Sequence, residues 1–147
     1  MRKLARHAIV VLLLSIFFSL SACERTLSDN EKANVLAFSE AVTDNMFDGL
    51  TANDYAGFSR DFDSDMSERV PATDFAVWKQ ELDYKLGDYI SRQVDQVTQS
   101  DEFFVVVYQA KFEQEEQVTV TAAFHASNKS IAFLSFESDK YSWSAWE

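Results

Sequence analysis

The spacing of hydrophobic residues changes once along this chain of 147 residues, at Gly87. Before Gly87, apolar residues recur every three or four positions, as they do on one face of a helix. After it they alternate with polar residues, which is the period of a half-buried strand. Because the helical segments all precede the strand segments, the pattern predicts an α+β fold in which helices pack on one face of a curved antiparallel sheet.

Three helices are predicted before this change of period. The first begins at Ser28, which has the spacing of a capping box with Glu31, and it runs to a stop at Gly49. A short second helix is predicted over residues 51–60, with a threonine as its cap. The third covers residues 71–86 and ends at a glycine, the residue that most favours a C-terminal cap.

About four strands are predicted after the change, at Tyr89–Thr98, Phe103–Glu113, Gln117–Ala126 and Ile131–Ser138. The run FFVVVY that opens the second strand is apolar on both sides. This favours a central strand covered by helices on one face and by a dimer mate or the C-terminal tail on the other. The aromatic tail from Tyr141 to Trp146 is predicted to be an extra edge segment that closes the core; an exposed tail would instead mark an interaction surface.

The first 22 residues have the features of a secretory signal peptide. Basic residues at positions 2, 3 and 6 precede an apolar run of 13 residues, Ala8–Leu20, which is followed by small residues. A helix needs about 20 apolar residues to span a bilayer, so this run is too short to be a membrane span. The combination predicts a cleaved signal peptide.

The end of this segment, Leu20-Ser21-Ala22-Cys23, resembles the lipobox of bacterial lipoproteins. The resemblance implies cleavage before Cys23, a diacylglycerol on its sulfur and acylation of the new amino terminus. No other cysteine is present to pair with it. The expected organisation is a signal peptide at 1–22, a lipid anchor and short linker at 23–27, and a single domain at 28–147. Because Glu24, not aspartate, follows the cysteine, the resemblance implies the periplasmic face and favours the outer membrane over the inner membrane.

The charge of the mature chain excludes one class of partner. All 24 acidic residues follow position 23, whereas three of the 13 basic residues precede it, so cleavage leaves 10 basic and 24 acidic residues and a formal net charge of −14. Binding to nucleic acid depends on neutralising phosphates with Lys and Arg, so no nucleic-acid partner is expected. Anionic headgroups would also repel this surface, so the lipid must provide the membrane anchoring.

The acidic stretch DFDSDMSE, residues 61–68, is spaced like the start of a calcium loop. Counted from Asp61, it has oxygen ligands at positions 1, 3 and 5, but an EF-hand also needs glycine at position 6 and glutamate at position 12. Those positions hold Met66 and Ala72. No metal site is therefore predicted, and the carboxylates are interpreted as caps of short helices, with Asp65 as a cap and Met66 turned inward. An irregular calcium site remains the alternative.

The sequence contains no motif that predicts a catalytic residue. Beyond residue 23 the chain has one histidine, His125, and it lacks the GxSxG, HExxH and glycine-rich phosphate-loop motifs. General acid–base catalysis by His125 would need a partner carboxylate within hydrogen-bond reach, for which Asp54 and Asp61 are the candidates.

The order of elements and several positions resemble the nuclear transport factor 2-like (cystatin-like) domains of bacterial lipoproteins. The resemblance covers about residues 29–138 and depends on Asp54, Tyr55, Phe58, Asp65, Met66, Trp78 and the helix end Leu86–Gly87. It implies three N-terminal helices inside a cone formed by a curved sheet of about four strands, with a pocket. Related folds include isomerases, dehydratases and binding or dimerisation modules, so the resemblance implies no single reaction.

Three functions are compatible with these features. The first is a non-enzymatic, lipid-anchored envelope protein that binds another envelope protein or forms a homodimer through the outer face of its sheet, with no cofactor besides the covalent lipid. The second is a small-ligand-binding cone, and the third an isomerase-like enzyme using His125. A filled interior favours the first, and an open apolar cavity the second. The residues expected to line such a pocket are Trp78, Tyr89, Tyr108, Phe124 and His125.

Overall fold

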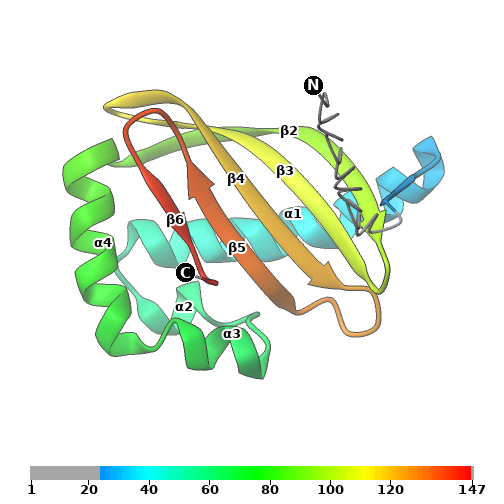
Figure 1. Ribbon diagram of the computed structural model, residues 1–147, viewed down its shortest axis with the longest axis horizontal. Helices are drawn as coiled ribbons and strands as arrows, with labels where there is room; N and C mark the ends of the chain where they lie inside the picture. The colour runs from blue at the N-terminus through cyan, green and yellow to red at the C-terminus, as the bar shows by residue number, and fades with distance from the viewer. Residues whose placement is uncertain (1–23, 147) are drawn as a thin grey trace, which may run out of the picture.

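The computed structural model describes residues 24–146 (Figure 1), so the predicted signal peptide and Cys23 lie outside the described residues. Four helices and six strands occur in this range. The helices are α1 (Asp29–Thr51), α2 (Tyr55–Phe58), α3 (Ser64–Arg69) and α4 (Ala72–Leu86). The strands are β1 (Glu24–Thr26), β2 (Tyr89–Ser100), β3 (Phe103–Phe112), β4 (Glu115–His125), β5 (Ile131–Glu137) and β6 (Ser142–Ser144).

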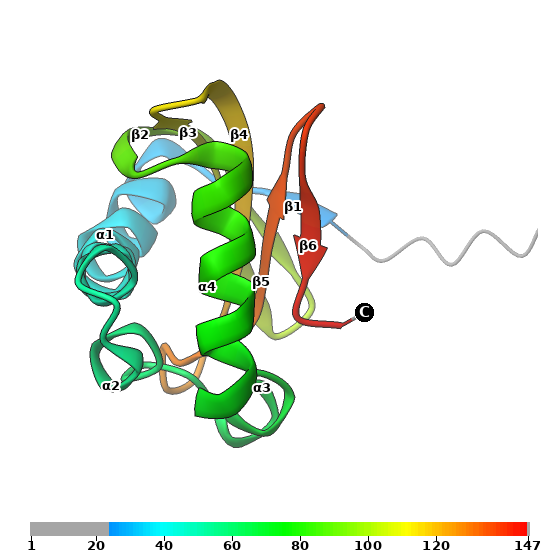
Figure 2. The same ribbon diagram turned by 90° about the vertical axis from the view of Figure 1, so that its left-hand side faces the viewer.

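The strands form one antiparallel sheet in the order β1-β2-β3-β4-β5-β6. Helices α1, α2 and α4 lie on one side of this sheet, which curves around them, and α3 lies at the end of β5 (Figure 2). The predicted α+β class is therefore confirmed. The predicted four strands and three helices are too few, because β1 and α3 are additional elements and the predicted edge segment forms a further strand, β6.

Helix α1 begins as the sequence predicts. The Ser28 hydroxyl accepts a hydrogen bond from the Glu31 amide, and the Glu31 carboxylate accepts one from the Ser28 amide at 2.9 Å, which completes the capping box. The predicted helix end at Gly49 and the cap at Thr51 are wrong, since α1 continues through both residues. Asp54 caps α2 in place of Thr51, by accepting from the Ala56 amide.

Gly49 does not end α1 but allows α2 to pack closely against it. A Cβ atom at this position would lie 2.1 Å from the backbone nitrogen of Phe58, which is closer than any real contact. The backbone of α2 thus lies directly against α1 at the one residue that has no side chain, and Phe58 is buried there. Glycine is required at residue 49 by this close approach.

The acidic stretch forms the start of α3. Its cap is Asp63, whose Oδ1 accepts a hydrogen bond from the Met66 amide at 2.7 Å, so the predicted cap at Asp65 is two residues too late. Met66 is fully buried, as predicted. The segment before α3 is held to the sheet by a parallel β-bridge between Phe62 and Ile131.

Both ends of the described chain join the sheet. Residues 24–26, predicted as part of a linker, pair with the end of β2 as the edge strand β1, and Leu27 is buried. The aromatic tail forms β6 along β5, and its Trp143 packs at 4.5 Å between ring centroids against Trp78 of α4. The predicted edge segment is confirmed; it pairs with β5, and Trp146 beyond it lines a hollow of the outer face together with Phe103 of β3.

The close approach at Gly49 predicts a large effect for a small substitution. Gly49→Ala should lower the free energy of unfolding by about 3 kcal/mol, because its methyl group must displace the backbone of α2. Urea unfolding followed by tryptophan fluorescence measures this change. Asp48→Ala, on the exposed side of the same turn, is the control and should change stability by less than about 0.5 kcal/mol. Similar effects of the two substitutions would contradict the packing role.

Candidate functional site

The outer face of the sheet, the side away from the helices, carries a strip of apolar side chains. Because side chains alternate between the two faces of a strand, the inward Val106 and Tyr108 place their odd-numbered neighbours outward. The β-ladder sets Val105 beside Ala123 and Ala123 beside Phe133. We call this set the apolar strip: Phe103, Val105 and Val107 of β3, Ala123 of β4 and Phe133 of β5. All five are partly exposed.

The only histidine of the described chain lies at one end of this strip. His125 is paired with Phe103 across the ladder, and the two rings are 4.8 Å apart between centroids. Its Nε2 lies 2.8 Å from Oδ2 of Asp63, while the other oxygen of this carboxylate caps α3. Asp63 therefore joins the start of α3 to the end of β4.

The backbone explains why Asp63 is the partner of His125. The Asp63 amide donates to the Ile131 carbonyl at 3.0 Å, and the Ile131 amide donates to the Asp61 carbonyl at 2.7 Å. These bonds fix the segment beside the start of β5. The carboxylates considered from the sequence have other partners: Asp54 caps α2, and Asp61 forms an ion pair with Arg60 at 2.8 Å.

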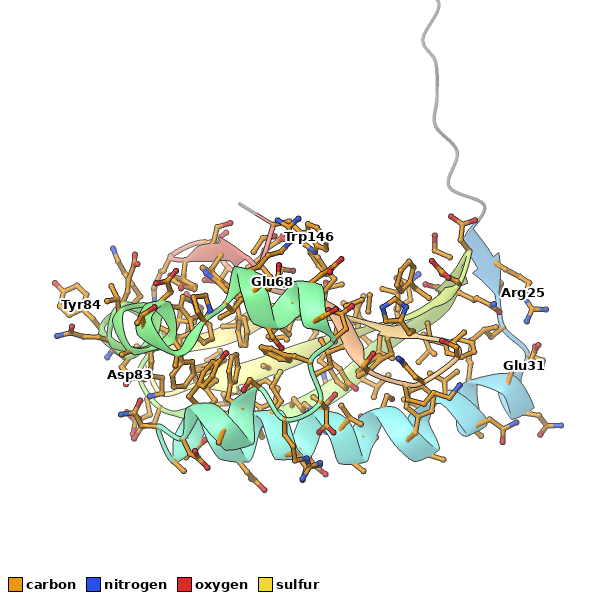
Figure 3. All side chains as sticks on the ribbon, turned by 90° about the horizontal axis from the view of Figure 1, so that it is seen from below. Arg25, Glu31, Glu68, Asp83, Tyr84 and Trp146 are labelled. Atoms are coloured by element: carbon orange, nitrogen blue, oxygen red, sulfur yellow. The ribbon has the colours of Figure 1, made fainter. Side chains whose placement is uncertain are left out.

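A hollow of about 350 Å³ adjoins the pair on the outer face. It is lined by Asp63, Asp65, Glu102, Phe103, Ala123, His125, Ala132, Phe133 and Trp146. Trp146 lies beside the helix that carries Glu68 (Figure 3), is 46% exposed, and stacks under the guanidinium of Arg69 at 3.6 Å. With three carboxylates beside aromatic rings, the hollow suits an apolar group that carries positive charge.

The residues predicted to line a pocket do not form one shared site. Trp78 of α4 is 6% exposed, and Tyr108 and Phe124 are fully buried on the inner face of the sheet. Tyr89, partly buried, stacks on Phe47 at 4.1 Å. None of the aromatic contacts in residues 24–146 joins two of these four residues, and His125 lies on the opposite face of the sheet. Their rings pack into the core.

Sequence reasoning missed a polar cluster between α1 and the sheet. Arg92 of β2 is turned inward with its side chain 8% exposed, and it donates hydrogen bonds to Asp44 at 2.7 Å and to Glu40 at 3.3 Å. Burial opposes the charge of Arg92, but these carboxylates more than offset it and raise its pKa. Burial also raises the pKa of the nearby Tyr108, whose hydroxyl bonds to Thr43 at 3.1 Å.

A signal for this cluster exists in the sequence. Arg92 stands at an inward position of its strand, and Glu40 and Asp44 are four residues apart, so they share one face of α1. The three side chains tie α1 to β2. They contact no hollow that also reaches His125, so the cluster is interpreted as structural.

Among residues 24–146, no group of three or more His, Cys, Asp or Glu side chains is arranged to hold a metal ion. Within the acidic stretch, Asp61 and Asp63 each already bind a cationic or hydrogen-bonding side chain, whereas Asp65 is exposed.

Comparison with known proteins assigns this chain to no family. No protein-family model matches it, and neither the curated proteins nor the solved structures give a match. Its function is therefore inferred from its own residues and their geometry.

The double role of Asp63 predicts unequal effects of two substitutions. Asp63→Ala should lower the free energy of unfolding by about 2 kcal/mol, because it removes both the helix cap and the bond to His125. Asp63→Asn should cost less than about 1 kcal/mol, since its one side-chain oxygen can still cap α3 and its amide NH2 can donate to an unprotonated Nε2 of His125. Urea unfolding measures both.

Asp65→Ala is the matched control for these variants, because Asp65 makes no side-chain hydrogen bond within residues 24–146. It should change stability by less than about 0.5 kcal/mol. Equal losses for Asp63→Ala and Asp65→Ala would show that Asp63 is not the cap.

Proposed function

We propose that this chain is the precursor of a lipid-anchored bacterial envelope protein, and that the mature protein is a non-enzymatic interaction module that docks a partner protein on the outer face of its sheet. The observation that carries this proposal is the apolar strip. Helices α1, α2 and α4 cover the inner face (Figure 2), and strand β6 of the aromatic tail pairs along the edge of β5, so five neighbouring apolar side chains remain partly exposed. Contiguous apolar surface of this kind is typical of interaction sites.

The charges around the strip favour one kind of partner. Asp63, Asp65 and Glu102 lie at its His125 end. Toward the other end, a polar trough is lined by acidic residues that include Asp95, Glu116, Glu137 and Asp139, while its Lys111 forms an ion pair with Glu116. The complementary surface has apolar side chains at its centre and Lys or Arg at its rim.

A second copy of this chain fits the same surface less well. A homodimer formed through the strip would bring two acidic rims together, and like charges facing each other across an interface are unfavourable. We therefore propose an envelope protein with a basic rim as the partner, in preference to a homodimer.

We further propose that the domain has the nuclear transport factor 2-like (cystatin-like) fold. Support comes from α1, which lies along the inner face of a curved sheet whose strands follow one another in sequence (Figure 1). The middle of this cone, around Trp78 and Phe136, is filled by aromatic side chains, which favours docking over a ligand bound there. An isomerase-like site would need His125 and a carboxylate inside, whereas His125 and Asp63 meet outside.

The anchor part of the proposal is supported by the lipobox and by the position of β1. No helix within residues 24–146 is long and apolar enough to cross a membrane. Cys23 directly precedes Glu24, the first residue of β1, and consecutive Cα atoms are about 3.8 Å apart. A lipid on Cys23 would therefore be attached next to the start of β1. It would hold this edge of the sheet beside the bilayer, on the periplasmic face. Because Glu24, and not aspartate, follows the cysteine, we propose the outer membrane.

Substitution of the proposed lipidation site tests the anchor. Cys23→Ser should abolish incorporation of labelled palmitate and leave an uncleaved precursor, because the serine hydroxyl cannot form the thioether that precedes cleavage. Metabolic labelling and the intact mass of the protein measure these effects. Ser21→Ala keeps a small residue in the motif and should be processed normally. Unchanged acylation and processing of Cys23→Ser would exclude a lipoprotein.

Site-specific photo-crosslinking in native membranes tests the docking surface. A photoreactive phenylalanine at Val107, in the strip, should form adducts with a protein whose crosslinked peptide has apolar residues flanked by Lys or Arg. Adduct yield should fall as salt is raised, because salt screens the charged rim. The same probe at Tyr84, which is 78% exposed on α4, is the matched control and should give no such adduct.

Each other outcome contradicts part of the proposal. An adduct with a second copy would replace the basic partner by a homodimer. Equal adducts from both positions, or none from Val107, would exclude the outer face as the docking surface.

A further inference from the structure

A second hollow opens on the other side of the sheet, between the N-terminal half of α1 and the strands beside β1. Its volume is about 310 Å³, at the lower end of the range for small-molecule pockets. The lining residues come from β1, α1, β2, β3 and the loop between β4 and β5: Arg25, Leu27, Glu31, Asn34, Val35, Phe38, Gln99, Phe104 and Lys129. We call it the α1–sheet pocket; it shares no residue with the apolar strip.

Four of the nine lining residues form an apolar wall of the α1–sheet pocket. Leu27 and Val35 are buried beside it. Phe38 of α1 and Phe104 of β3 pack against each other at its edge, with their ring centroids 6.1 Å apart and their planes tilted by 52°. Phe38 is held in turn by an edge-to-face contact with the fully buried Phe124 at 5.7 Å. The two aromatic walls are therefore fixed by the core, which favours binding without rearrangement.

One lysine stands over these aromatic walls. The Lys129 Nζ lies 5.0 Å from the ring centroid of Phe38 and 5.1 Å from that of Phe104, and it donates to the Ala126 carbonyl. Its backbone has a φ of 67°, an uncommon conformation for a residue with a side chain. No carboxylate within residues 24–146 forms an ion pair with Lys129, although acidic residues greatly outnumber basic ones.

The other charges of the pocket cancel. Arg25 and Glu31, which lie together at the start of the fold (Figure 3), form an ion pair at 2.6 Å. Hydrogen bonds from the side chain and backbone of Ser28, and then from Arg25, lower the pKa of Glu31 to about 2, so it is ionised at neutral pH. Lys129 therefore leaves one net positive charge beside the apolar wall of the pocket.

We propose that the α1–sheet pocket binds a single-chain anionic amphiphile of the fatty-acid type, with its chain along Phe38, Phe104 and Val35 and its carboxylate at Lys129. The apolar walls match the chain, and the single uncompensated cation matches one monoanionic headgroup. The small volume favours one chain over the two of a membrane phospholipid. This site does not depend on the docking surface, which lies on the opposite face of the sheet.

Photolabelling of the full chain in phosphatidylcholine vesicles tests the proposal. The probes are decanoate and decanol that carry the same diazirine, and peptide mass spectrometry locates the label. Decanoate should label peptides that contain Phe38 or Phe104 about tenfold more than decanol does, since a hydrogen bond to a charged group contributes about 1.5 kcal/mol. Lys129→Met keeps the length of the side chain, removes the charge and should bring decanoate labelling down to the level of decanol.

Two further variants make the result specific. Lys140→Met is the matched control, because Lys140 also donates to a backbone carbonyl, that of Gln114, but lies outside the pocket. Its labelling should match that of the unsubstituted chain. Asn34→Trp, at an exposed position of α1 on the rim, should fill the entrance and abolish labelling even if Lys129→Met destabilises the fold.

Three results would overturn the proposal. Equal labelling by decanoate and decanol, unchanged in Lys129→Met, would exclude recognition of a carboxylate. Label concentrated on the apolar strip would exclude this pocket as the site. Loss of decanoate labelling when phosphatidylglycerol is added to the vesicles would identify an anionic phospholipid as the ligand in place of a fatty acid.

Discussion

The aromatic rings packed around Trp78 fill the middle of the core and so limit where this protein can bind a ligand or a partner. Its ring lies within 6 Å of the rings of Phe58, Phe136 and Trp143, with centroid distances of 5.4, 5.6 and 4.5 Å, and thus joins α4 to α2, β5 and β6. A chain with one cysteine has no internal disulfide, so its stability depends on this core. Because the aromatic rings fill the space between helices and sheet, binding surfaces are left to the outer face and to the end where α1 diverges from the strands.

The long elements could be predicted from the sequence because each repeats its pattern several times. Helices α1 and α4 and strands β2 to β5 all have clear periods. In contrast, β1 and β6 are three residues long and α3 is six, too short for a period to appear. The helix end predicted at Gly49 is wrong for a related reason. A glycine at this spacing is typical of a helix end, but here it allows the backbone of Phe58 to approach α1, which only the tertiary structure shows.

Some residues of the candidate sites could be predicted from the sequence, but the side chains that they contact could not. His125 was identified because it is the only histidine after residue 23, yet its partner Asp63 depends on backbone bonds between residues 61–63 and Ile131. Four of the five residues assigned to a pocket are aromatic residues that pack in or against the core. The sequence alone does not distinguish an aromatic residue that lines a pocket from one that fills the core. Lys129 gave no signal at all, because its position over Phe38 and Phe104 results from the turn between β4 and β5.

The ladder also places both candidate surfaces near the proposed anchor. Glu24 pairs with Ser100, and Ser100 pairs with Phe103, so the apolar strip begins two strands away from the first residue of β1. The α1–sheet pocket is lined by Arg25 of the same edge strand. A lipid on Cys23 would therefore hold both surfaces within a short distance of the bilayer. A partner on the strip must then present its basic, apolar surface close to the membrane, and an amphiphile could enter the pocket from the bilayer without crossing much water.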